Sequence, residues 1–253
     1  MKRHIDDEIQ SLKDRVLRMG SLAEEMIHLA VKTLIERKAE YSQKVFEREQ
    51  QVNLLQMEID EEGVRILALY QPEARDLRTI MSAIKINAEL ERIADQAVNI
   101  TQTCCNYLLT ETPLSSTLDI PRMAELAKEM IKDSLDAFTR RDVELAQSIL
   151  KKDVEQDILK ARLLNEVVAT IPQQTDKTQQ LIELILIAKN LEKIGDHATN
   201  IAEDIIFMIL GQDVRHHNHD HPELSPQAQS EPQPESSQSE PQSETSPDSS
   251  QTN

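Results

Sequence analysis

Apolar residues recur at spacings of three and four along most of the first 211 residues, which is the pattern of helices that bury one face. Four prolines interrupt the pattern, at Pro72, Pro113, Pro121 and Pro172, and Gly211 ends it. Proline is tolerated in the first turn of a helix or just before it, and glycine commonly follows the last turn. The pattern therefore predicts six helices, near residues 4–38, 42–70, 74–111, 121–141, 143–170 and 175–211.

The links between these predicted helices are short. Short links between long helices make sequential helices pack as antiparallel neighbours, and three such helices form a bundle. We therefore expect an all-α fold with two tandem, pseudo-symmetric three-helix bundles, one in residues 1–111 and one in residues 112–211.

The segment after the last predicted helix, residues 212–253, has a different composition. Ser, Gln, Glu and Pro dominate it, and almost no aliphatic residue remains after Leu224. Such a segment cannot bury enough apolar surface to offset the entropy lost on ordering, so we predict a disordered acidic tail. Four histidines near its start could hold a divalent metal loosely or simply belong to a solvated linker: His216, His217, His219 and His221.

Composition supports the helical reading. The chain of 253 residues has four glycines and 2% aromatic residues, so its core must be aliphatic, and helix formers outnumber strand formers. The formal net charge of −17 argues against nucleic acid as a partner, because such binding relies on cationic contacts to phosphates. Cationic partners or bound metal ions suit this charge better.

The spacing of the two cysteines and the length of the apolar runs indicate the cellular compartment in which the protein is expected. Cys104 and Cys105 are adjacent and cannot build a disulfide framework, which favours a reducing cytoplasm. The longest late apolar run, at 205–210, is far shorter than the roughly 20 residues that a membrane span needs. Lys2 and Arg3 are not followed by an apolar run of the kind found in signal peptides. We expect a cytoplasmic protein that reaches a membrane only through its partners.

An internal repeat is the strongest feature of the sequence. Residues 90–100 match residues 191–201, which read Leu-Glu-Arg-Ile-Ala-Asp-Gln-Ala-Val-Asn-Ile and Leu-Glu-Lys-Ile-Gly-Asp-His-Ala-Thr-Asn-Ile. The apolar members step by three and four along one helix face in each copy. They are Ile86, Leu90, Ile93, Ala97 and Ile100 in the first copy, and Ile187, Leu191, Ile194, Ala198 and Ile201 in the second.

Carboxylates recur as i, i+4 pairs in each unit, and Glu91 with Asp95, like Glu192 with Asp196, projects from nearly the opposite side of its helix to the apolar stripe. The repeat contains two of these pairs, Glu91 with Asp95 and Glu192 with Asp196. The preceding helix of each unit carries one more, Asp153 with Asp157 in the second unit and the looser Glu49 with Asn53 in the first. Side chains at this spacing share a face roughly 6 Å apart, so two adjacent helices would set three or four oxygen donors around one centre. Oxygen donors suit iron, manganese, magnesium or calcium, whereas structural zinc prefers cysteine and histidine.

Two readings of the acidic pairs remain open. They can form a solvated helix face, paired with Arg92 or Lys193, in a metal-free helical scaffold. The two copies nevertheless share Leu-Glu-(Arg/Lys)-Ile-x-Asp while the exposed positions around it differ, which favours a metal-related role.

Enzyme chemistry has little support in the sequence. A carboxylate-bridged di-iron oxidase needs Glu-x-x-His twice, and this chain offers it once, at Glu25 and His28. We expect His28 and His197 to be surface or packing residues. No glycine-rich elbow, phosphate cradle or Cys/His pair with an orienting acid is visible, so we do not expect an enzyme.

Several motifs together are similar to one known family. They are Gln-Pro-Glu-Ala-Arg-Asp-Leu-Arg at 71–78, the two copies of the repeat at 90–100 and 191–203, and the opening that runs from Ile5 through Met19 and Gly20 to Glu25. In these motifs the chain resembles the PhoU family of bacterial phosphate-uptake regulators over roughly residues 3–211. The resemblance implies the same pair of pseudo-symmetric three-helix bundles.

The resemblance also implies ligands and partners. In the PhoU family, motifs of the form Glu/Asp-x-x-x-Asp hold multinuclear metal clusters, commonly of iron, with zinc, magnesium or manganese as other occupants. Asn53 stands here where the family usually has an acid, and Ala94 where a glycine is common, which implies a weaker first cluster. The implied role is a non-catalytic adaptor, commonly a homodimer, which restrains phosphate uptake and phosphate-starvation signalling. Its implied partners are a Pst-type phosphate ABC transporter and a PhoR-like sensor histidine kinase.

Overall fold

The computed structural model describes residues 3–109 and 119–214, and within them the regular structure is helical throughout. The six long helices are α1 (His4–Glu36), α2 (Ala39–Tyr70), α3 (Ala74–Thr103), α4 (Ile120–Arg140), α5 (Val143–Thr170) and α6 (Thr178–Leu210). The predicted all-α fold with six helices is confirmed, and all six predicted starting points lie within three residues of the observed ones.

Two helix ends differ from the prediction for local reasons. α3 gives way at Cys104 to one π-helical turn, η1 (Cys104–Leu108), because the Leu109 N–H bonds to the Cys104 carbonyl five residues back, at 3.0 Å. α6 begins late, because two short 3-10 turns precede it, η2 (Ile171–Gln173) and η3 (Thr175–Lys177). Pro172 has no N–H with which to continue α5, so the chain tightens and turns there.

The proline and glycine that the pattern predicts at helix boundaries are found there. Pro121 lies in the first turn of α4, and Gly211 ends α6 in the left-handed conformation with φ +73°. Three other helices end on a residue with a side chain in the same conformation: Arg37, Gln71 and Arg141. A left-handed residue other than glycine carries a steric cost, so these three turns hold local strain.

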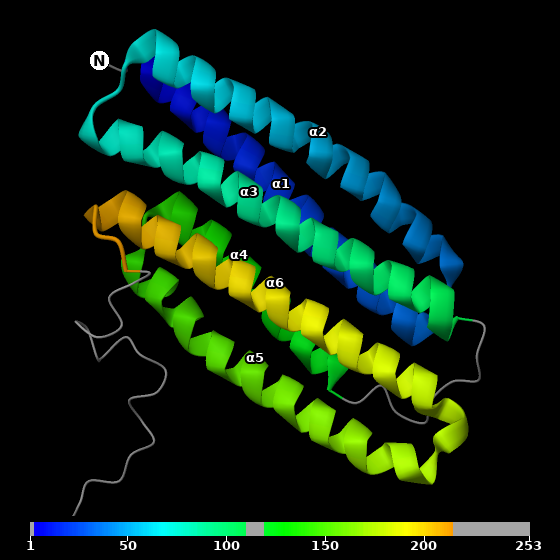
Figure 1. Ribbon diagram of the computed structural model, residues 1–253. Coiled ribbons are helices and arrows are strands. Elements are labelled where there is room, and N and C mark those ends of the chain that lie inside the picture. The colour runs from blue at the N-terminus through cyan, green and yellow to red at the C-terminus, as the bar shows by residue number, and fades with distance from the viewer. Residues whose placement is uncertain (1–2, 110–118, 215–253) are drawn as a thin grey trace, which may run out of the picture.

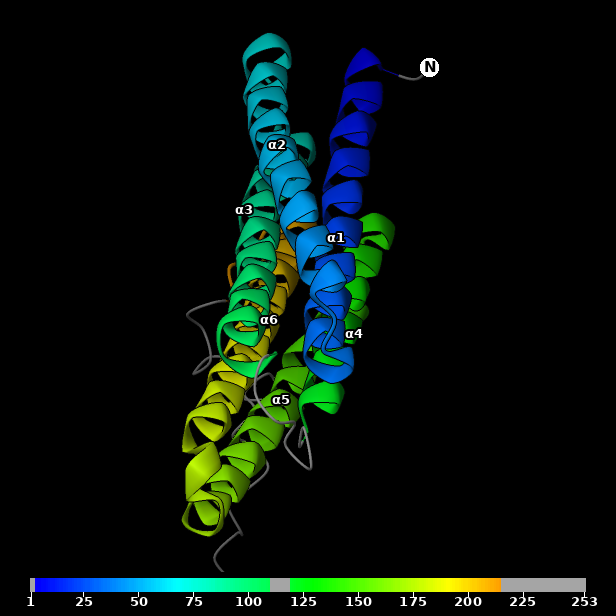
Figure 2. The same ribbon diagram turned by 90° about the vertical axis from the view of Figure 1, so that its right-hand side faces the viewer.

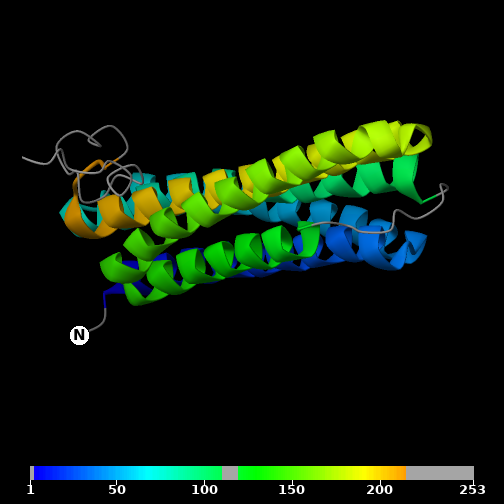
Figure 3. The same ribbon diagram turned by 90° about the horizontal axis from the view of Figure 1, so that it is seen from below.

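Helices α1–α3 form one three-helix bundle and helices α4–α6 form a second beside it (Figure 1). α3 and α6 run antiparallel along the middle of the molecule, and α1 packs against α4, while α2 and α5 lie at the outer edges (Figures 1 and 2). Seen from below, the start of α1, the α4–α5 turn and the end of α6 gather at one end of the molecule (Figure 3). The predicted pair of tandem bundles is confirmed.

Some predictions fall outside the described residues. The predicted boundary between the repeats, at 111 and 112, lies within 110–118, which the structure does not describe. The four tail histidines and almost all of the predicted tail lie in 215–253, which is likewise outside the described residues.

The core is aliphatic and continuous across both repeats. All ten residues of the two predicted apolar stripes are fully buried. Burial of this kind supplies most of the favourable folding free energy, at about 25 cal/mol per Å² of apolar surface. Gly20 lets α1 approach α4 closely, since a Cβ there would lie 2.5 Å from Cδ1 of Leu135.

Polar contacts join the repeats where α3 meets α6. Lys85 on α3 forms an ion pair with Asp204 on α6 at 3.0 Å. Glu89 on α3 accepts hydrogen bonds from Nδ1 of His197 at 2.7 Å and from Nδ2 of Asn200 at 3.1 Å. His197 is therefore a packing residue and His28 an exposed one, which confirms the expectation for both.

Two further features of the described residues are the state of the cysteines and the apolar character of the helices. Cys104 is buried and Cys105 partly exposed, and both are free thiols. Burial raises the pKa of the Cys104 thiol to about 12, so it stays protonated at neutral pH. None of the helices in the described ranges combines the length and the apolar character that crossing a membrane would require.

Candidate functional site

The acidic pairs of the second repeat face one another across α5 and α6. Asp153 shows this most clearly, because burial, together with nearby carboxylates, raises its pKa from an ordinary 3.8 to about 6. The carboxylates that act on it are Asp196, Asp157 and Glu192. The pKa of Asp196 is also raised, by burial and then by Glu192. The structure thus places the four acidic residues that the sequence predicts for this repeat near enough for their charges to interact.

Gly195 makes room for this second-repeat cluster. A Cβ at Gly195 would lie 3.3 Å from a carboxylate oxygen of Asp153 and 3.4 Å from Cγ of Gln156. The first distance is short for a Cβ contact and the second is an ordinary van der Waals contact, so the absence of a side chain on α6 lets Asp153 sit directly against the helix backbone. The first repeat has Ala94 at the equivalent place, where it is buried.

Gln156 adds an oxygen with no partner to this cluster. Its side chain is fully buried on α5, one turn after Asp153, and its Nε2 donates a 3.0 Å hydrogen bond to the Leu191 carbonyl of α6. Its Oε1 has no hydrogen-bond partner among the described residues. A buried oxygen without a donor is costly and calls for an explanation, such as an ion or ligand.

A lysine, rather than either predicted partner, neutralises part of the cluster. Nζ of Lys160 on α5 lies 2.5 Å from Oε1 of Glu192, and this hydrogen bond raises the pKa of Lys160. Among the described residues, Arg92 and Lys193 form no ion pair with the acidic motifs. Lys160 therefore supplies one positive charge to a group of four carboxylates.

The first repeat builds a smaller version of the same cluster. Burial raises the pKa of Glu49 on α2, and Asp95 on α3 raises it further. Burial and Asp95 likewise raise the pKa of Glu91. Asn53 is exposed and contributes no charge. Three carboxylates thus meet here, against four in the second repeat.

The donor chemistry fits a cation, although the side chains do not yet converge. Among residues 3–109 and 119–214, no three Asp, Glu, His or Cys side chains stand as a group that could hold a metal ion in their present positions. The second-repeat cluster nonetheless offers carboxylate oxygens, the unpartnered Oε1 of Gln156 and a glycine, Gly195, against which Asp153 packs closely. These are features that a hard or borderline cation would use.

Three residues near these clusters were not predicted from the sequence. They are Lys160, Gln156 and Asn87. Asn87 is buried on α3, and its Nδ2 donates hydrogen bonds to the Gln56 carbonyl at 3.0 Å and to Asp60 at 2.9 Å. Gln156 and Asn87 are both fully buried, so a polar residue at a core position was the available signal. Lys160 lies three residues after Asp157, where a helix brings side chains together.

Comparison with known proteins gives a family match over most of the chain. The model of the PhoU domain matches residues 16–104 and 120–205, one stretch in each repeat. A phosphate-specific transport system accessory protein PhoU homolog of Pseudomonas putida is 34% identical over 216 residues, which cover 85% of this chain and 84% of that protein. The homolog of the same name from Clostridium acetobutylicum is 32% identical over 214 residues, 84% of this chain and 97% of that protein.

Solved structures agree with the family match. The crystal structure of PhoU from Pseudomonas aeruginosa superposes with a TM-score of 0.79 at 33% identity, covering 83% of this chain and all of that one. The phosphate transport system regulatory protein PhoU from Streptococcus pneumoniae has a TM-score of 0.75 at 24% identity, which shows a shared fold.

Proposed function

The chain belongs to the PhoU family, and from this membership we propose that it is a cytoplasmic regulatory adaptor of a phosphate-specific transport system. In this role it contacts components of a Pst-type phosphate ABC transporter and a PhoR-like sensor histidine kinase. It restrains phosphate uptake and phosphate-starvation signalling when phosphate is plentiful. It acts by binding and needs no catalytic turnover.

The observation that carries this proposal is the extent of the match. Both repeats match the PhoU domain, and the chain spans most of the length of relatives named as accessory proteins of phosphate-specific transport. A fold alone does not fix a function, so the proposal rests on the sequence match along both repeats and not on the helical architecture.

Exposed apolar side chains on the outer helices support an adaptor. On α2, Leu54, Met57 and Val64 are each more than half exposed, and they follow one another along a single stripe. On α5, Ile158 and Val168 are similarly exposed. Apolar surface of this kind is typical of protein interfaces, including those of the homodimer that we expect in this family.

We further propose that the second-repeat cluster holds metal ions through Asp153, Asp157, Glu192 and Asp196. Iron is the first candidate, with zinc, magnesium or manganese as the others. Bound cations would neutralise a group of carboxylates in which the pKa values of Asp153 and Asp196 are raised, and would give Oε1 of Gln156 a partner. Binding requires Glu192 to exchange the ammonium group of Lys160 for the metal.

The first-repeat cluster, made by Glu49, Glu91 and Asp95 with the amide of Asn53, would bind metal more weakly. It has one carboxylate fewer, and Ala94 carries a Cβ at the position where the second repeat has Gly195. Fewer charged donors lower the affinity for a cation.

Elemental analysis by mass spectrometry tests the metal proposal. We expect bound metal in gently purified protein, a clear loss in the variant Glu192→Gln with Asp196→Asn, and no loss in the control Glu125→Gln with Glu155→Gln. The control removes the same two charges at exposed positions that pair with Lys128 and Arg122. Equal metal content in all three proteins would contradict the proposal and leave the metal-free scaffold.

Co-purification and kinase assays test the adaptor. We expect the chain to co-purify with phosphate transporter components and to lower the autophosphorylation of the sensor kinase without turnover of its own. Oxygen consumption after loading with ferrous iron would instead support the di-iron oxidase alternative. Absence of any contact with transporter or kinase would contradict the adaptor.

A further inference from the structure

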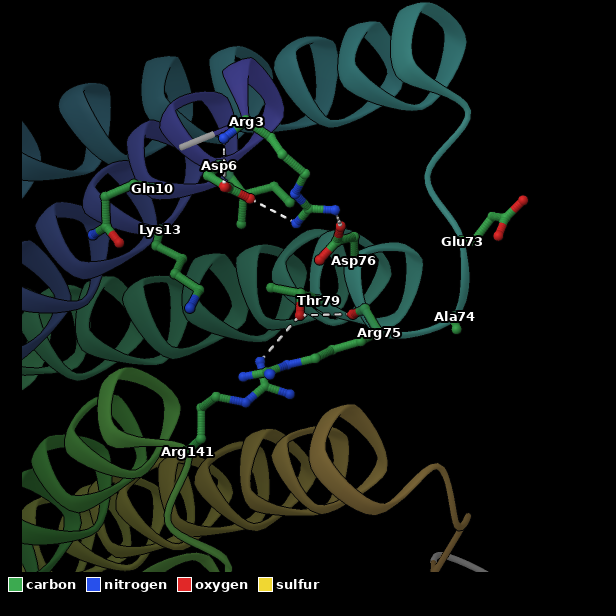
Figure 4. A pocket seen from close by; sticks show the side chains of 11 residues that line it. Arg3, Asp6, Gln10, Lys13, Glu73, Ala74, Arg75, Asp76, Thr79 and Arg141 are labelled. Carbon is green, nitrogen blue, oxygen red and sulfur yellow. Dashed lines mark hydrogen bonds and ion pairs between the residues drawn. The ribbon is translucent and has the colours of Figure 1, made fainter. Parts of the chain in front are cut away.

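A pocket of about 560 Å³ opens at the end of the molecule where the two repeats meet, and none of the residues that line it belongs to the acidic motifs. It lies between the first turns of α1 and α3 and the α4–α5 turn (Figure 4). In a chain of net charge −17, this pocket gathers cations from three separate elements: Lys13 of α1, Arg75 of α3 and Arg141 of the α4–α5 turn. Figure 4 shows the three side chains pointing toward the same space.

The three basic side chains have no acidic partner of their own. None of the ion pairs formed by the described residues includes Lys13, Arg75 or Arg141. Lys13 is half-buried, and burial together with Arg141 and Arg75 lowers its pKa. Burial and Arg75 lower the pKa of Arg141 as well. The pocket thus holds mutual repulsion that an anion would relieve.

The carboxylates that line the pocket are already engaged or turned away. Arg3 pairs with Asp6 at 2.6 Å and with Asp76 at 2.9 Å, which places both acids at one edge. Glu73 is exposed and its carboxylate points away from the basic groups in Figure 4. The remaining space is therefore bounded mainly by cationic donors.

The guanidinium group of Arg141 is held in place with donors to spare. It donates to Oγ1 of Thr79 at 3.2 Å and to the Met208 carbonyl, at the negative end of α6, at 3.3 Å. A guanidinium carries five N–H donors, so others remain for a ligand. Thr79 in turn donates to the Arg75 carbonyl at 2.9 Å, which fixes its hydroxyl oxygen toward Arg141. The positive end of the long helix α3 lies at the same wall.

We propose that this basic pocket binds a phosphate group, through the ammonium of Lys13 and the guanidinium groups of Arg75 and Arg141. Arginine and lysine donors converging on one point are the usual recognition elements for phosphate oxygens. The phosphate is either free orthophosphate or the terminal phosphate of a nucleotide. The pocket volume falls in the range of pockets that hold drug-sized ligands, so it has room for either. The site shares no residue with the acidic clusters, and its binding is independent of the metal proposal.

Equilibrium dialysis at constant ionic strength tests the inference with the full chain as purified, using radiolabelled orthophosphate in one arm and ATP in the other. We expect saturable binding of at least one of them. The substitutions Arg75→Gln and Lys13→Gln should each weaken that binding about tenfold or more, as the loss of a hydrogen bond from a charged donor implies. Arg75 is exposed in the first helical turn, so its variant should fold normally.

The matched control is Arg140→Gln. Arg140 neighbours Arg141, carries the same charge and is exposed outside the pocket, and its nearest acid is Asp136 at 3.9 Å. Saturable binding of orthophosphate that Arg75→Gln weakens and Arg140→Gln does not would identify free phosphate as the ligand. The same pattern with ATP bound at least tenfold more tightly would identify a nucleotide phosphate. No saturable binding of either, or equal weakening in Arg75→Gln and Arg140→Gln, would overturn the proposal while leaving metal content and partner contacts untouched.

Discussion

Lys160 and Glu192 form a 2.5 Å contact between α5 and α6, and this contact places an ammonium group among the carboxylates of the second-repeat cluster. The lysine and a metal ion would compete for the same oxygen. We expect Lys160→Met to raise the metal affinity of the second repeat several-fold, because Glu192 becomes available and the local negative charge increases. Competition with a fluorescent chelator measures the change.

The control for that prediction is Lys151→Met, an exposed lysine on the same helix that takes part in no ion pair of the described residues. It removes the same charge outside the cluster and should leave the affinity nearly unchanged. Equal gains in both variants would attribute the effect to net charge and count against a direct competition.

Asp153 predicts how stability depends on pH in metal-free protein. Its folded-state pKa, about 6, lies above its ordinary value of 3.8, so the folded state holds a proton that the unfolded state has already released. The resulting penalty is absent below about pH 3.8 and complete above about pH 6. We expect Asp153→Asn to increase the free energy of unfolding at pH 7 by about 1 kcal/mol, a value reduced because the carboxyl is partly exposed.

Urea denaturation in the presence of a chelator measures this difference at pH 7 and near pH 4. The gain of the Asp153→Asn variant over the wild type should shrink as the pH falls through this window. A gain that stays constant with pH would mean that the carboxylates do not interact.

Gly195 and Ala94 form a natural pair for testing the space beside the clusters. We expect Gly195→Ala to keep the fold, since the first repeat already carries alanine there, and to lower the metal affinity of the second cluster about tenfold by pushing Asp153 away. Ala94→Gly should change affinity in the opposite direction in the first repeat. Isothermal titration with the metal found in purified protein measures both, and an unchanged affinity after Gly195→Ala would show that the space has no role.

Gln71 predicts a stabilising substitution. It ends α2 with φ +46°, a conformation that is costly for any residue with a Cβ, and its side chain is exposed. We expect Gln71→Gly to increase the free energy of unfolding by about 0.5 to 1 kcal/mol. The same change at exposed Gln50, in the interior of α2, should instead cost about 1 kcal/mol. Urea denaturation distinguishes them, and a loss of stability in both variants would show that the turn is not strained.

The hydrogen bond between Glu89 and His197 joins the two repeats, and we expect it to contribute to the stability of the protein. Burial opposes ionisation of Glu89, but the hydrogen bonds from His197 and Asn200 outweigh it and lower the pKa of Glu89. We expect Glu89→Ala to destabilise the protein by about 1.5 kcal/mol, with much of that loss absent when His197 is already alanine. A double-mutant cycle by urea denaturation measures the coupling, which would be near zero if the contact contributed nothing.

Much of the fold could be predicted because its signals are local. The apolar stripes, Pro121 and Gly211 each report on their own helix, and the repeat revealed the pseudo-symmetry. The four carboxylates of the second-repeat cluster were also predictable, since acidic residues recur there at a fixed spacing, as in Glu192 and Asp196. What the sequence could not provide was the pairing between helices. The ion pair of Lys160 with Glu192 and the closeness of Lys13 to Arg141 both result from the packing of separate helices. The spacing of residues within one helix does not determine such contacts.

The antiparallel contact between α3 and α6 bears on the origin of the molecule. Equivalent helices of two related units that cross this way reproduce the geometry of a twofold-symmetric dimer, in which the same patch meets itself. A single ancestral repeat would have paired with a second copy of itself through that patch. Fusion of two such copies would free each half to diverge, in keeping with the different residues at equivalent positions, such as Gly195 and Ala94, or Asp157 and Asn53.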